Sequence, residues 1–139
     1  MDPSVVIFGI AIVIVGILVF LAILLTNKKA YSFNKEDYQV DFLRIENSLT
    51  KDNPMSYNMS VVEADKLLDK ALLEMGVPGK TMGDRLKKSG EKFTQLNSVW
   101  YAHKLRNQIA HEHHFSLEYN QARRALNTYK QALQDLGAI

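Results

Sequence analysis

Residues 5–25 form an unbroken run of 21 apolar residues that contains no charged or hydrogen-bonding side chain. As a helix, this run would rise about 31 Å, which matches the hydrocarbon core of a bilayer. All 17 Lys and Arg residues follow the run, beginning with Lys28 and Lys29. Because basic flanks stay in the cytoplasm, the sequence predicts a single-pass anchor in the cell (inner) membrane at residues 1–27, with the N-terminus outside.

A cleaved signal and a buried core helix agree less well with the flanks and length of this run. A cleavable secretory signal begins with basic residues, has a shorter apolar core and ends in small residues. Here the N-terminal flank carries only Asp2, and Thr26 follows the run. A buried core helix of this length would need more protein around it than the rest of a 139-residue chain provides. The membrane is therefore the first expected partner.

Residues 28–139 are expected to form one cytoplasmic domain, because about 110 residues suffice for a single modest core. The chain has no Cys, which excludes disulfides and thiolate metal sites. From residue 26 onward there are 17 basic and 14 acidic residues. This balance is too even to indicate nucleic-acid binding by charge alone.

Apolar residues of this domain recur at helical spacing, and no stretch alternates as a strand would. We expect N-caps at Asn34, Asn53 and Ser116, and a helix end at Gly76. The predicted fold class is all-α, with the transmembrane helix followed by a small four- to five-helix up-and-down bundle. The recurring apolar positions are Tyr38, Phe42, Ile45 and Leu49, then Val61, Ala64, Leu68, Ala71 and Met75, and finally Leu117, Ala122, Leu126, Tyr129, Leu133 and Leu136.

Residues 76–95 hold four of the seven glycines and form a connecting segment. Within it, Thr81 and Asp84 have the spacing of a capping box, which would open a short helix through Lys88. The segment is locally basic, which fits contact with RNA or anionic lipid head groups, but fits an ordinary solvated face as well. Its basic residues are Lys80, Arg85, Lys87, Lys88 and Lys92.

Residues 96–114 carry polar side chains in a regular arrangement. Five residues of this segment follow one another at spacings of three, four, four and three, so they would lie on one stripe of a continuous helix. They are Trp100, His103, Asn107, His111 and His114. Asn107 and His111 are helical neighbours and are expected to hydrogen-bond, which would fix the orientation of the imidazole. Trp100 and Tyr101 fit either a base-stacking or a core role.

Within this segment, residues 105–111 read Leu-Arg-Asn-Gln-Ile-Ala-His. They resemble the signature of the HEPN superfamily, in which four to six residues separate an Arg from a His and a polar residue, often Asn, follows the Arg directly. Arg106, Asn107 and His111 occupy these positions. The wider setting, a small all-α bundle with one more amphipathic helix after the motif, is similar over residues 34–136.

The resemblance implies a metal-independent endoribonuclease without a cofactor, acting as a homodimer whose two motifs face each other in a cleft. It implies that His111 is the general base or acid when an RNA 2′-hydroxyl attacks the adjacent phosphorus. Arg106 would stabilise charge on the phosphoryl oxygens, and Asn107 would orient one of them. The products would carry a 2′,3′-cyclic phosphate and a 5′-hydroxyl. His103 and Trp100 are further candidates for substrate binding.

A non-catalytic interpretation of the same residues is a membrane-tethered helical module that binds a partner protein or itself. Arg106 would then be an interhelical clamp to Asp65 or Asp69. His111 would lie at the C-terminal end of its helix, where the dipole favours a cation.

A zinc site is a third interpretation, built on His111, His114 and Glu118. These residues span an expected helix break, and His103 would lie about 12 Å along the axis from His111. This is a poor ligand set for zinc. We therefore predict no metal site.

Overall fold

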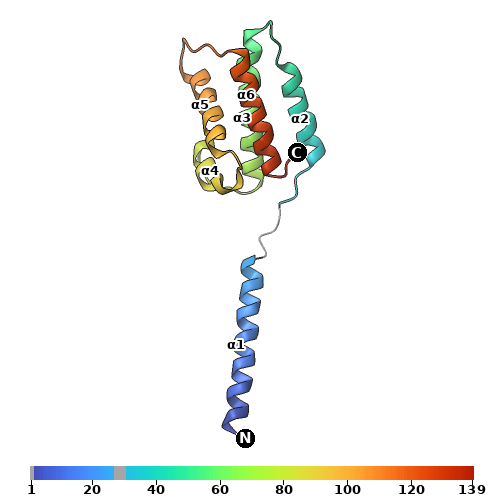
Figure 1. Cartoon of the computed structure of the whole chain (residues 1–139), viewed down its shortest axis with the longest axis vertical. Helices are drawn as coiled ribbons and strands as arrows, with labels where there is room; N and C mark the ends of the chain where they lie inside the picture. The colour runs from blue at the N-terminus through green and yellow to red at the C-terminus, as the bar shows by residue number, and fades with distance from the viewer. Residues whose placement is uncertain (1, 27–30) are drawn as a thin grey trace. The chain divides into compact units, whose positions relative to one another are not determined.

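The computed structural model describes residues 2–26 and 31–139. The chain divides into two compact units, Met1–Ser32 and Phe33–Ile139. The all-α prediction is confirmed, because the described residues form six α-helices and one 3₁₀ turn and no strand (Figure 1). The boundary predicted between residues 27 and 28, and the basic flank at Lys28 and Lys29, lie outside the described residues.

The first unit consists of helix α1, Pro3–Thr26. Proline is favoured at the first position of a helix, where its missing N–H has no partner to lose. Every residue from Asp2 to Leu25 is exposed, although almost all of them are apolar. By length and composition alone, the stretch Pro3–Leu25 is able to cross a membrane.

The second unit is a bundle of four long helices with a short helix at one end. In Figure 1 the chain runs up α2, down α3, up α5 and down α6, with α4 at the lower end. Helix α3 packs against α2, α4, α5 and α6, so it is the central element of the bundle. The bounds of the elements are α2 Lys35–Ser48, α3 Pro54–Glu74, α4 Met82–Ser89, the 3₁₀ turn Gly90–Lys92, α5 Leu96–His111 and α6 Tyr119–Asp135.

A single hydrophobic core lies between the four long helices, and most of the predicted apolar positions contribute to it. Its largest fully buried side chains include Phe42, Leu68, Leu72, Tyr129 and Leu133. Residues spaced three or four apart lie on one face of a helix, so each amphipathic helix buries one stripe in this core.

Three of the expected helix-capping residues cap their helices in the structure. The amide of Met55 donates to Asn53 Oδ1 at 3.1 Å, and the capping box of Thr81 and Asp84 opens α4. Gly76 follows the end of α3 with φ +74°, a conformation that glycine adopts without steric cost. Asn34 lies at the N-cap of α2, but its side chain donates a hydrogen bond to Asp37 and accepts none from a backbone amide of the helix.

The expected N-cap of the last helix at Ser116 is wrong, because Glu118 occupies that position. Leu117 is buried in the core, and α6 begins only at Tyr119. The amide of Glu118 donates to Gln121 Oε1 at 3.0 Å, which takes the place of a cap by Ser116. Helix α5 ends at His111, so His114 does not share the stripe of Trp100 and His103.

Candidate functional site

A groove of about 750 Å³ lies between α3, α4 and α5. All five residues proposed from the sequence line it, namely Trp100, His103, Arg106, Asn107 and His111. Helix α5 brings these residues to one side, because Val99, Ala102 and Leu105 point into the core and leave the stripe beside them at the groove. His111 is exposed on the last turn of the helix.

Asp65 is a buried carboxylate on α3 that connects three helices at the floor of the groove. The residue is only 3% exposed. Its Oδ1 accepts a hydrogen bond from the hydroxyl of Tyr129 on α6 (2.9 Å) and lies 2.8 Å from Nδ1 of His103 on α5. Its Oδ2 lies 3.5 Å from Nε of Arg106. A buried carboxylate needs such partners, because an unpaired one is costly to remove from water.

The contacts of Asp65 continue through α5 and close a ring. Nη1 of Arg106 donates to Oδ1 of Asn107 at 3.2 Å, and Nδ2 of Asn107 lies 3.3 Å from Nε2 of His103. With the amide in this orientation, His103 Nε2 is an acceptor and the proton on Nδ1 is donated to Asp65. We call Asp65, His103, Asn107 and Arg106 the carboxylate ring.

This ring changes two of the sequence expectations. Asn107 is bound to His103 and Arg106, so the expected bond between Asn107 and His111 is wrong. The imidazole of His111 is exposed, has no hydrogen-bond partner among the described residues and can contact a ligand. His103 is buried, so it supports the floor of the groove rather than its open rim.

Tyr129 anchors the ring from α6. Burial raises the pKa of the Tyr129 hydroxyl well above its ordinary value, and the negative charge of Asp65 and the hydrogen bond to it raise it further. The phenol therefore stays neutral and keeps donating to Asp65 throughout the physiological range.

A second ion pair, Arg85 with Asp69, fixes the wall of the groove. Nε and Nη2 of Arg85 donate to the two carboxylate oxygens of Asp69 at 2.6 and 2.8 Å. Nη1 donates to the carbonyl of Gly79 at 2.6 Å. The hydrogen bond to Asp69 raises the pKa of Arg85 against the opposing effect of burial. This fork holds α4 and the preceding loop against α3, and it makes Asp69 unavailable to Arg106.

The non-catalytic interpretation named Asp65 as a partner of Arg106, and the structure places the two in an ion pair. Sequence reasoning missed the bonds of Asp65 to His103 and Tyr129, and it missed the pairing of Arg85 with Asp69. The available signal was the spacing of Asp65 and Asp69, which lie four apart and on the same side of α3. Asp65 also lies on the face of α3 that buries Val61, Ala64 and Leu68. A carboxylate on such a face indicates a buried partner.

The charges around the groove favour an anionic ligand. Five Lys and Arg side chains line it against three carboxylates. Two of those carboxylates, Asp65 and Asp69, are already paired. The third, Asp84, caps α4, and hydrogen bonds from Thr81 lower its pKa. Lys80 and Lys87 lie in no ion pair within 4 Å among the described residues, although the charge of Lys87 contributes to the lowered pKa of Asp84.

No group of three or more His, Asp and Glu side chains within residues 2–26 and 31–139 is arranged to hold a metal ion. His111 lines the groove, whereas His114 and Glu118 follow the end of α5 in the exposed connection to α6. Comparison of the chain with protein-family models, with curated proteins and with solved structures finds no match.

Proposed function

We propose that this chain is a membrane-anchored HEPN-like domain that binds single-stranded RNA and cleaves it without a metal ion. One observation carries the proposal. Arg106, Asn107 and His111 line a single groove together with cationic side chains that lack carboxylate partners. A fixed guanidinium, an amide and an exposed imidazole are suited to hold a phosphodiester and to move protons at it.

The reaction we propose is an internal transesterification. The 2′-hydroxyl loses its proton to a general base, and its oxygen bonds to the adjacent phosphorus. The bond from phosphorus to the 5′-oxygen breaks, and that oxygen takes up a proton. His111 would serve as the base or the acid, while the outer edge of Arg106 would stabilise charge on the phosphoryl oxygens. A homodimer, as the family resemblance implies, would supply a second His111 for the other proton transfer.

We further propose that α1 anchors the domain in the cell membrane, with its N-terminus outside and the bundle in the cytoplasm. The length and apolar surface of Pro3–Leu25 support the anchor. The bias of Lys and Arg toward the C-terminal side supports the orientation.

The second candidate is a non-catalytic helical module that recognises another protein through the same groove. The carboxylate ring favours it, because Arg106 Nε lies against Asp65 and His103 is held on both ring nitrogens. Groups bonded in this way also occur as purely structural links between helices.

The experiment compares variants of the full chain purified in detergent micelles and incubated with unstructured RNA in EDTA. We expect the wild type to yield 2′,3′-cyclic phosphate ends. Arg106→Ala and His111→Ala should each slow cleavage by about 100-fold or more, the usual effect of losing a general acid–base or electrostatic contact. Matched controls are Arg123→Ala and His113→Ala, whose exposed side chains do not line the groove.

RNA cleavage by the wild type, read together with thermal melts of the same variants, separates the two candidates. The module predicts no cleavage by the wild type and a stability loss of roughly 1–3 kcal/mol for Arg106→Ala, since one partner of a buried carboxylate is removed. The ribonuclease predicts that His111→Ala loses activity with an unchanged melt. RNA cleavage that survives both substitutions would contradict the proposed mechanism.

A further inference from the structure

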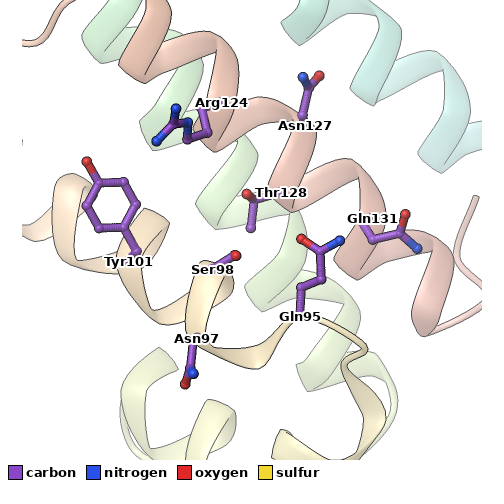
Figure 2. Close-up of a pocket in the computed structure, with 8 residues that line it drawn as sticks. All are labelled: Gln95, Asn97, Ser98, Tyr101, Arg124, Asn127, Thr128 and Gln131. Carbon is purple, nitrogen blue, oxygen red and sulfur yellow. The ribbon is translucent and has the colours of Figure 1, made fainter.

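A second groove, of about 700 Å³, lies between α5 and α6 (Figure 2). Its lining is polar and contains one charged side chain, the cation Arg124, and no carboxylate. Four amide side chains line it, Gln95 and Asn97 at the beginning of α5 and Asn127 and Gln131 on α6. In Figure 2 Gln95 and Gln131 lie near each other, whereas Asn97 points away from α6 and Asn127 points away from Gln95. We call this hollow the amide groove.

The amide groove has hydrogen-bonding capacity that the fold does not use. Gln131 donates to Asp135 at 3.0 Å. The side chains of Gln95, Asn97 and Asn127 have no hydrogen-bond partner within the described part of the chain, and Arg124 has no ion-pair partner there. Each amide offers two donors and a carbonyl acceptor in one plane. This is the chemistry of the edge of a nucleobase.

Tyr101 and Arg124 lie toward the same end of the amide groove in Figure 2. The residue Tyr101 is 45% exposed, which is unusual for an aromatic ring in this bundle and leaves a face available for stacking. Arg124 presents a planar fork of donors that suits a phosphate. An aromatic ring and a cation at one end of a groove lined by neutral amides suit a nucleotide better than an acidic or purely apolar ligand.

A third hollow of about 400 Å³ lies on α5 and shares lining residues with both grooves. It shares Trp100, His103 and Asn107 with the first groove and Tyr101 with the amide groove, and Lys104 lies between them. Tyr101 and Asn107 are about 9 Å apart along the helix axis. They are also about 120° apart around that axis, so a strand that contacts both grooves would pass over the exposed face of α5 at Lys104.

We propose that the amide groove is a base-binding subsite for the same RNA strand whose phosphate lies at Arg106. In this subsite, Tyr101 stacks on a base, the amides bond its edge and Arg124 holds a neighbouring phosphate. The inference rests on the proposed function, since it assigns the position of a nucleotide next to the one cleaved. It goes beyond that function by naming a separate surface that determines how strongly longer RNA is held.

The test measures binding of fluorescein-labelled oligouridylates of two and eight nucleotides to the full chain in micelles, by anisotropy at fixed salt. The wild type should bind the eight-nucleotide RNA more tightly. The double variant Tyr101→Ala/Arg124→Ala should reduce the ratio of the two affinities by about 10-fold, because stacking and phosphate contacts are lost. The single variant Tyr101→Phe retains the aromatic ring, so its ratio of affinities should stay close to that of the wild type. Arg123→Ala and Asn120→Ala are exposed neighbours on α6 outside the groove, and they serve as controls.

The outcomes keep this inference separate from the proposed ribonuclease. Binding with a reduced ratio but without cleavage supports the subsite and contradicts the enzyme. Cleavage with an unchanged ratio in the double variant overturns the subsite and leaves the enzyme. If the wild type binds neither RNA, both fail. If the double variant instead changes the oligomeric state by sedimentation, the amide groove is an interface between copies and the subsite is overturned.

Discussion

At the scale of single residues, Asp65 has the largest influence on the candidate site. Its two oxygens meet Tyr129, His103 and Arg106, so each of these side chains is oriented by the same carboxylate. Hydrogen bonds to a buried charge are stronger than those between neutral groups. Arg106 is held by an ion pair instead, because its buried Nε lies 3.5 Å from Asp65 Oδ2 and forms no hydrogen bond with the described residues.

Tyr129→Phe tests this anchor through its pH dependence. The raised pKa of Tyr129 means that the folded state keeps the phenol protonated at a pH where the unfolded chain ionises. This contribution to the free energy of unfolding is present below about pH 10. Above that pH it is lost by about 1.4 kcal/mol per pH unit. We expect the variant to be less stable by roughly 1–2 kcal/mol near neutrality and this deficit to shrink between pH 9 and 11. Urea unfolding across this range measures it.

The control for this prediction is Tyr101→Phe, since Tyr101 is largely exposed and lies away from Asp65. It should follow the wild type at every pH. A stability deficit of Tyr129→Phe that stays constant up to pH 11 would contradict the assigned role of the buried hydroxyl.

The sequence predicted which residues share the groove but not how they bond. Helical periodicity alone placed His103, Asn107 and His111 on one stripe of α5. Asn107 has a histidine four residues away on each side, and nothing local selects between them. The choice depends on Asp65, 38 residues before His103 in the chain. Helical periodicity cannot predict a hydrogen-bond partner so distant in the sequence.

At the scale of elements, the connection from α3 to α4 forms one wall of the site. Gly79 has no room for a side chain, because a Cβ there would lie 2.8 Å from Asp84 Cβ and 2.9 Å from the Arg85 amide. We expect Gly79→Ala to lower the free energy of unfolding by about 1–3 kcal/mol, as overpacking does. It should also loosen the fork between Arg85 and Asp69. Chemical denaturation of the full chain in micelles measures the change.

Gly83→Ala is the matched control on the neighbouring helix. A Cβ at Gly83 would make only ordinary contacts of 3.8–3.9 Å. Because alanine favours the helix over glycine, this variant should be neutral or more stable by up to about 1 kcal/mol. Equal stability of the two alanine variants would show that Gly79 is not tightly enclosed.

Helix boundaries could be predicted where they depend on a local capping residue. The prediction was wrong where core packing determines the boundary. Asn53, Gly76 and Thr81 each act within a few residues of their own position, and all three were correctly assigned. Ser116 has the chemistry of a cap, but burial of Leu117 delays the helix until Tyr119. Tertiary packing can override a capping preference worth about 1 kcal/mol.

At the scale of the whole molecule, the chain combines an apolar helix with a bundle that has its own core. We expect the full chain to remain in the membrane pellet after an alkaline wash, with an intact mass that still includes residues 1–26. Deletion of residues 3–25 should move it to the soluble fraction, because the apolar surface of α1 is removed. Fractionation with mass spectrometry measures both.

Two point variants provide the control for this expectation. Ile14→Lys places a charge near the middle of the apolar run and should reduce membrane retention, since such a residue costs about 2.5–3.5 kcal/mol at the centre of a membrane helix. Ile14→Leu should behave as the wild type. A mature protein that begins after Leu25 would instead identify the run as a cleaved signal.

The carboxylate ring has a consequence for finding what this protein binds. Asp65 ties α3 to α5 and α6 while bordering the groove, so whatever occupies that groove also acts on the folding equilibrium. A compound that binds only the folded form raises the melting midpoint by mass action. A melting-temperature screen of nucleotides and short peptides can therefore reveal the natural occupant even before any reaction has been assayed.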